Sequence, residues 1–127
     1  MLEPAEAIRL LIVDDERVIA DTLATIFTQA SYETRAAYSA EEALALIEGW
    51  TPGLALIDVV LPGMNGIDLA IRLKAELPGL RLTLISGQAV TTGLLEHARR
   101  DGYDLDIVAK PVHPSTLLNL MASHRMN

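Results

Sequence analysis

The chain has 127 residues, which suits a single domain, and half of these residues are hydrophobic. It contains no cysteine, which excludes disulfides and thiolate metal sites and is compatible with the reducing cytoplasm where we expect the protein. With a formal net charge of -7 it offers no basic stripe to a phosphate backbone, so we expect no direct nucleic-acid binding. No apolar run approaches the length of a membrane span, and residues 1–7 lack the basic start of a signal peptide, so we expect no membrane association.

Short apolar runs alternate with amphipathic stretches along the first half of the chain. The run at 8–13 predicts a strand covered on both faces, and an apolar stripe predicts a helix over about 16–30. A weaker strand is predicted at 33–37. Ser39 then has the character of a helix N-cap, with Glu42 three residues later in the spacing of a capping box, which predicts a second helix.

The second half of the chain continues this alternation of strands and helices. Three further apolar runs predict strands, at 54–58, 81–86 and 105–109. Helices are predicted after each of them, over about 66–77, from about 90 to Gly102, and from Pro114 onward. Five strand–helix repeats indicate an α/β fold: a doubly wound, five-stranded parallel sheet with helices on both faces.

Polar side chains follow the predicted strands at their carboxyl ends, where ligands bind in folds of this class. The first strand leads into Asp14 and Asp15, the third ends at Asp58, the fourth ends at Ser86, and Lys110 follows the fifth. Carboxylates that converge in this way repel one another unless a cation binds, and Mg²⁺ prefers such oxygen ligands. Carboxylates, a lysine and a hydroxyl together favour phosphoryl transfer, with a carboxylate as a competent acceptor.

Four motifs resemble the receiver domain of bacterial two-component response regulators. They are VDDE at 13–16, LIDVVLPGMNGIDL at 56–69, LISG at 84–87 and AKP at 109–111. The resemblance extends from about residue 8 to 122 and implies one receiver domain over residues 1–127, with no output domain in this chain. It also implies the flavodoxin-like strand order 2-1-3-4-5.

The resemblance implies a phosphoacceptor signalling switch rather than an enzyme, one that assists its own phosphoryl transfer and dephosphorylation. Asp58 would accept the phosphoryl group from a phosphohistidine on a histidine kinase or a histidine phosphotransfer protein. Mg²⁺ would be held directly by Asp15, Asp58 and the backbone carbonyl of Val60, and through water by Asp14. The signal would pass to a downstream protein target or to a fused output domain, so that the chain either acts alone or belongs to a longer regulator or hybrid kinase.

The resemblance also implies contacts to the phosphoryl group and a switch position. Ser86 and Lys110 would each contact a phosphoryl oxygen, Gly87 would leave the site open with its N–H available, and the Lys110–Pro111 peptide bond would be cis. Three residues before the lysine, Ile107 replaces the aromatic residue that the family usually has.

Isoleucine cannot reproduce the movement of an aromatic switch residue, because its β-branched side chain is stiff at χ1. We therefore expect Ile107 to stay packed in both states of the switch. The segment 87–104, which is slightly longer than the family usually has, is expected to carry the conformational change instead.

Three other functions fit parts of the same pattern. Aspartate-nucleophile phosphatases use similar groups but resemble D-x-D after the first strand, whereas this chain has Asp14, Asp15 and Glu16 in sequence. A degenerate interaction module would normally have lost an acidic or lysine position, and none is lost here. A flavin-binding protein would need a phosphate-binding loop after the first strand, and the sequence has no such loop rich in Ser, Thr and Gly.

Overall fold

The computed structural model describes residues 7–87, 96, 99–100, 102, 106–110 and 113–125. Across these residues five strands form one sheet in the order β2-β1-β3-β4-β5, and all neighbouring strands are parallel. The strands are β1 (Arg9–Val13), β2 (Glu33–Ala37), β3 (Leu54–Asp58), β4 (Arg81–Ser86) and β5 (Asp106–Ala109). The predicted fold class and strand order are confirmed.

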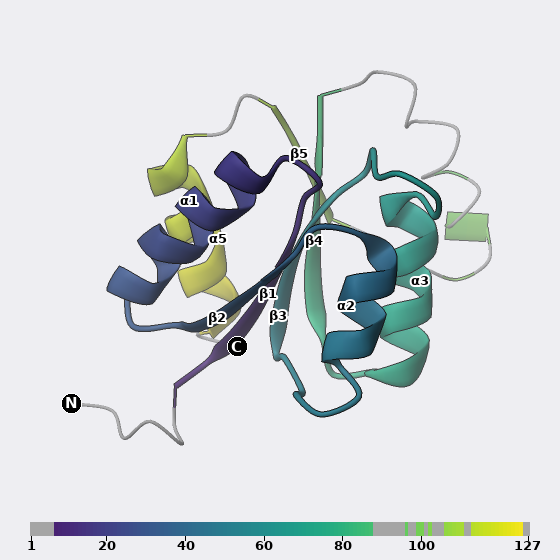
Figure 1. Ribbon diagram of the computed structural model, residues 1–127, viewed down its shortest axis with the longest axis horizontal. Coiled ribbons are helices and arrows are strands. Elements are labelled where there is room, and N and C mark those ends of the chain that lie inside the picture. The colour runs from purple at the N-terminus through teal and green to yellow at the C-terminus, as the bar shows by residue number, and fades with distance from the viewer. Residues whose placement is uncertain are drawn as a thin grey trace.

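Helices cover both faces of the sheet, as Figure 1 shows. They are α1 (Arg17–Gln29), α2 (Ala40–Leu46), α3 (Gly66–Glu76) and α5 (Pro114–Arg125). Helices α1 and α5 lie on one face, and α2 and α3 lie on the other. Most of the helix predicted from about 90 to Gly102, most of the segment 87–104 and the Lys110–Pro111 bond lie outside the described residues.

The central strands are apolar over most of their length because both of their faces are covered. Every residue of β3 is buried, and alternate residues of β1 point to opposite faces. Leu11 and Val13 pack with residues of α2 and α3, whereas Leu10 and Ile12 pack with residues of α1 and α5. Among the described residues, no helix is long and apolar enough to cross a membrane.

Side-chain caps set where two loops at the carboxyl ends of the strands turn into helices. The Ser39 hydroxyl accepts a hydrogen bond from the Glu42 N–H at 3.1 Å, and the Glu42 carboxylate accepts one from the Tyr38 N–H at 3.1 Å. The predicted capping box is therefore present, although its return bond reaches one residue before the cap. At the start of α3, the Asn65 side chain accepts a hydrogen bond from the Asp68 N–H at 2.8 Å.

Candidate functional site

Three carboxylates meet at the carboxyl ends of β1 and β3, which are neighbours in the sheet. Asp14 and Asp58 are buried, with 3% and 5% of their surface exposed, and Asp15 is exposed. One carboxylate oxygen from each of the three residues lies within 4.8 Å of the others. The structure therefore brings together the three acidic residues that the sequence singled out.

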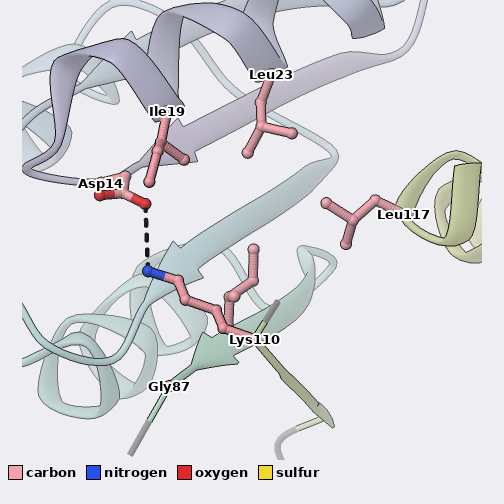
Figure 2. Close-up of a pocket in the computed structure, with 7 residues that line it drawn as sticks. Asp14, Ile19, Leu23, Gly87, Lys110 and Leu117 are labelled. Carbon is pink, nitrogen blue, oxygen red and sulfur yellow. Dashed lines mark ion pairs between the residues drawn. The ribbon is translucent and has the colours of Figure 1, made fainter. Parts of the chain in front are cut away.

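Lys110 brings a positive charge to these carboxylates from the end of β5. Its Nζ lies 3.0 Å from Oδ2 of Asp58 and 3.8 Å from Oδ2 of Asp14; Figure 2 marks the second of these ion pairs. The Lys110 N–H donates to the Ser86 carbonyl at 2.8 Å, which extends the pairing of β4 with β5 by one residue. We call Asp14, Asp15, Asp58 and Lys110 the carboxyl-end cluster.

Backbone N–H groups hold both buried carboxylates in place. Oδ1 of Asp58 accepts a hydrogen bond from the Val60 N–H at 3.1 Å, and Oδ1 of Asp14 accepts one from the Glu16 N–H at 2.9 Å. Each donor lies two residues after its carboxylate, in the local pattern that Asp favours in turns. With Oδ1 of Asp58 on the backbone and Oδ2 on Lys110, both oxygens of this carboxylate have a fixed partner.

The electrostatics of the cluster favour a further cation. Burial raises the pKa of Asp14 above its ordinary value of 3.8, and the charge of Asp58 adds to this rise, against the Glu16 N–H and the charge of Lys110. Burial by itself would lower the pKa of Lys110, but the hydrogen bond to Asp58 and the surrounding negative charges raise it overall. The cluster contains three carboxylates and one lysine, so it keeps an excess of negative charge when its acids are ionised.

The donor set of the cluster fits a hard divalent cation. All its candidate ligand atoms are carboxylate oxygens, within the 4.8 Å spread that one ion can bridge. A divalent cation would also offset the cost of keeping the buried Asp14 ionised. The acidic cluster could therefore bind a metal ion of the Mg²⁺ type.

The remaining predicted site residues lie around this cluster. Ser86 is buried at the end of β4, paired with Ala109, and Gly87 is exposed beside the stem of Lys110. Val60 is 51% exposed. A pocket of about 230 Å³ lies at the cluster, and the residues that line it are Asp15, Glu16, Asp58, Val60, Gly87 and Lys110. Sequence reasoning did not assign Glu16 to the site, although it belongs to the VDDE motif.

A larger cavity of about 530 Å³ opens beside the cluster, between α1 and α5 (Figure 2). Asp14 and Lys110 form its polar wall, and apolar side chains form the rest. The described residues that line it are Asp14, Ile19, Leu23, Ile85, Gly87, Lys110 and Leu117. Sequence reasoning missed this cavity because its lining comes from five separate segments of the chain.

The prediction that the Ile107 side chain is packed does not hold in this structure. We expected this side chain to be packed, but 38% of its surface is exposed. Ile107 lies on β5, the last strand of the described sheet, which pairs only with β4. An edge strand has fewer neighbours to cover its side chains than β1 or β3 has.

The family described as "Response regulator receiver domain" matches residues 10–122 of the chain. The chain belongs to this family. It is 31% identical over 110 residues to the "DNA-binding response regulator MtrA" of Mycolicibacterium smegmatis, a match that covers 87% of this chain and 47% of that protein. It is also 34% identical over 112 residues to PhoB, the phosphate regulon transcriptional regulatory protein of Pseudomonas aeruginosa, a match covering 86% of this chain and 48% of PhoB.

Solved structures agree with the family assignment. A CheY-like response regulator receiver domain protein from Methanospirillum hungatei superposes with a TM-score of 0.85 at 33% identity, and the match covers 94% of each chain. Receiver domains of this family are signalling domains, and the curated relatives are named as regulators rather than as enzymes. The receiver thus has the role of a signalling switch in two-component systems.

The comparisons overturn one expectation from the sequence. We expected no direct nucleic-acid binding, but MtrA is named a DNA-binding response regulator and PhoB a transcriptional regulatory protein. This chain spans about half the length of these relatives. A net charge of -7 describes the receiver alone, so it cannot exclude DNA binding by another part of a protein that carries such a receiver.

Proposed function

We propose that Asp58 is the phosphoacceptor of the switch and takes its phosphoryl group from a phosphohistidine on a partner protein. In this step a carboxylate oxygen of Asp58 forms a bond to phosphorus while the nitrogen–phosphorus bond breaks, and the freed imidazole takes its proton from water. The observation that carries the proposal is the Lys110–Asp58 contact of 3.0 Å within a group of three carboxylates. This contact places a cation where the charge of a transferring phosphoryl group would develop.

We assign Mg²⁺ to the same site, with Asp15, Asp58 and the carbonyl of Val60 as direct ligands and Asp14 as a ligand through water. When bound, the ion would neutralise negative charge on the carboxylates and on the incoming phosphoryl oxygens. In support of this assignment, the N–H of Val60 donates to the Asp58 carboxylate at 3.1 Å, so Val60 lies beside the proposed ligands.

The phosphoryl group, once on Asp58, would be held by Lys110, by the hydroxyl of Ser86 and by the N–H of Gly87. Lys110 would exchange its carboxylate partner for a phosphoryl oxygen, which is a charge-assisted contact of comparable strength. Contacts that exist only in the phosphorylated form favour one conformation over the other, and this difference is the signal.

The output of the switch is a proposal of the same kind. We infer that the phosphorylated receiver regulates a protein target or an attached output module in the cytoplasm. A DNA-binding module is one such output, in line with the name of the relative MtrA. Self-assisted phosphoryl transfer and dephosphorylation also belong to this proposal, because the carboxyl-end cluster supplies both an acceptor and a cation.

Mass spectrometry of the intact protein, incubated with acetyl phosphate and Mg²⁺, tests the proposal. The wild-type protein should gain the mass of one phosphoryl group, and excess chelator should prevent the gain. Asp58→Asn should abolish it, whereas the control Asp68→Asn changes an exposed carboxylate at the start of α3 and should leave it intact. Wild-type labelling of Asp58→Asn would show that the acceptor is another residue, and an unlabelled wild type would favour the unphosphorylated interaction module.

A further inference from the structure

We propose that Gly66 is a positioning residue for the site, because it lets the first turn of α3 press against the Asp58–Val59 peptide. The proposal rests on the function proposed for Asp58. Gly66 is the first residue of α3 and lies eight positions after the acceptor, outside the group of charged residues that do the chemistry.

The contact is made by backbone atoms that cannot turn aside. A Cβ atom placed on Gly66 would lie 2.8 Å from Cα of Val59 and 2.9 Å from the carbonyl carbon of Asp58, and it would also meet the carbonyl oxygen of Asp58. Carbon atoms in proteins pack at about 3.5–4.0 Å, so any side chain here would force the helix and the strand end apart.

Space, rather than backbone conformation, requires glycine at this position. Gly63 and Gly102 have positive φ angles of 75° and 93°, whereas Gly66 is not among the described glycines with positive φ. Alanine would also be the better helix former at the start of α3. A helix that begins with glycine despite this preference indicates that the close approach matters more here than local helix stability.

Hydrogen bonds connect this close approach to the acceptor carboxylate. The Gly66 N–H donates to the Val59 carbonyl at 2.8 Å, and the Val59 N–H donates to the Ile85 carbonyl of β4 at 2.9 Å. The next residue, Val60, donates its N–H to Oδ1 of Asp58 at 3.1 Å. A shift of the Asp58–Val59 peptide would therefore move the carboxylate and the Val60 carbonyl together.

Such a shift would matter because the partners of Asp58 come from other strands. Asp14 and Asp15 follow β1, and Lys110 follows β5, so none of them would move with α3. A site assembled from three strands loses its geometry when one contributor is displaced, and small misplacements of reacting groups reduce rates steeply. Gly66 thus sets the position of Asp58 relative to its cation and to the other carboxylates.

The test compares Gly66→Ala with the matched control Gly79→Ala, whose added Cβ would meet nothing within 4 Å. Mg²⁺ affinity is measured by calorimetry and the rate of labelling by acetyl phosphate from intact mass, both referred to the folded fraction that circular dichroism gives. We expect Gly66→Ala to weaken Mg²⁺ binding and slow labelling, each roughly tenfold. Gly79→Ala should leave both close to wild type.

Folded Gly66→Ala with wild-type Mg²⁺ affinity and labelling rate would overturn the proposal, even if its melting temperature had fallen. If Gly66→Ala does not fold, Asn65→Ala decides the question, because it loosens the first turn of α3 by removing the hydrogen bond to the Asp68 N–H. It should weaken Mg²⁺ binding by roughly two- to fivefold, and an unchanged affinity would overturn the proposal. A wild type that takes no phosphoryl group would refute the proposed function, whereas the Mg²⁺ affinities would still decide the role of Gly66.

Discussion

The two ends of the sheet handle charge in opposite ways. At the amino ends of the strands, the Glu33 carboxylate accepts a hydrogen bond from Nε1 of Trp50 at 2.6 Å and pairs with Nε of Arg9 at 3.0 Å, while Arg35 lies over the Trp50 ring at 5.1 Å. We call these four residues the amino-end cluster. Here cations outnumber the carboxylate and every group has a partner. At the carboxyl ends, three carboxylates lie together and Lys110 pairs with two of them, Asp14 and Asp58.

This difference in charge balance indicates that the amino-end cluster stabilises the fold, whereas the carboxyl-end cluster serves function. Complementary charges beside a buried aromatic ring favour the fold, because the Trp50 N–H keeps a partner in Glu33 when the ring leaves water. At the carboxyl ends, burial raises the pKa of Asp14 and the neighbouring charge of Asp58 adds to this rise, so the ionised form of Asp14 destabilises the fold. A protein retains such an arrangement where the chemistry of a site requires it, and unfavourable local features concentrate at such sites.

The amino-end cluster can be broken most severely at Trp50, which is 4% exposed. Trp50→Ala should lower the free energy of unfolding by about 3–5 kcal/mol, because it leaves a cavity and removes one of the two partners of Glu33. Urea unfolding measures this loss, and Trp50→Phe, which keeps most of the ring, should lose clearly less. Mg²⁺ affinity of the folded variant should stay at the wild-type value, and a large change in it would contradict the separation of the two ends.

Removal of Lys110 from the carboxyl-end cluster should change the affinity of the site for Mg²⁺. Lys110→Ala leaves Asp14 and Asp58 without their cation, so Mg²⁺ should bind about tenfold more tightly, which corresponds to about 1.4 kcal/mol. The conformational response to phosphorylation should become weaker at the same time. Calorimetry measures the affinity, and Lys74→Ala, which removes a lysine that bonds to the Leu80 carbonyl instead, is the control. Weaker Mg²⁺ binding by Lys110→Ala would show that the lysine supports the metal rather than competing with it.

The smallest expected effect, a gain in stability, follows from the raised pKa of Asp14. A raised pKa in the folded state means that ionised Asp14 destabilises the fold at neutral pH, and that this cost disappears as the pH falls through the folded pKa toward 3.8. Asp14→Asn should therefore raise the free energy of unfolding by about 1 kcal/mol at neutral pH without Mg²⁺.

Urea unfolding over a range of pH measures this gain, and the difference between Asp14→Asn and wild type should shrink on acidification. Asp15→Asn is the matched control, because Asp15 is exposed and its replacement should change stability less. A difference that grows as the pH falls would contradict the cause assigned to the shift.

Much of the fold could be predicted because a parallel sheet has a simple pattern. Strands covered on both faces are rich in apolar residues, so the runs at 54–58 and 81–86 predicted β3 and β4 with their observed bounds. The acidic residues could be placed together because carboxyl ends of parallel strands share one edge, and the structure brings them within 4.8 Å. These predictions required only the local sequence of each strand and the fact that all strands run in parallel.

The features that the sequence did not reveal depend on contacts between distant elements. The exposure of Ile107 follows from the position of β5 at the end of the strand order, which nothing within the strand itself indicates. The cavity beside the cluster needs α1, β4 and α5 to be placed before its shape exists. The close approach of Gly66 to the backbone of Asp58 was also not predictable, because only the path of the loop brings these two residues together.

The order of the cluster along the chain has a consequence during protein synthesis. Lys110 lies 52 residues after Asp58, and all three carboxylates leave the ribosome before it. At the usual rates of about 5–20 residues per second, Asp58 waits about 3–10 s for its cation. Since β5 is made after the other described strands, a nascent receiver holds its three acids before it holds the lysine that pairs with two of them, and the cluster is complete only once β5 has joined the sheet.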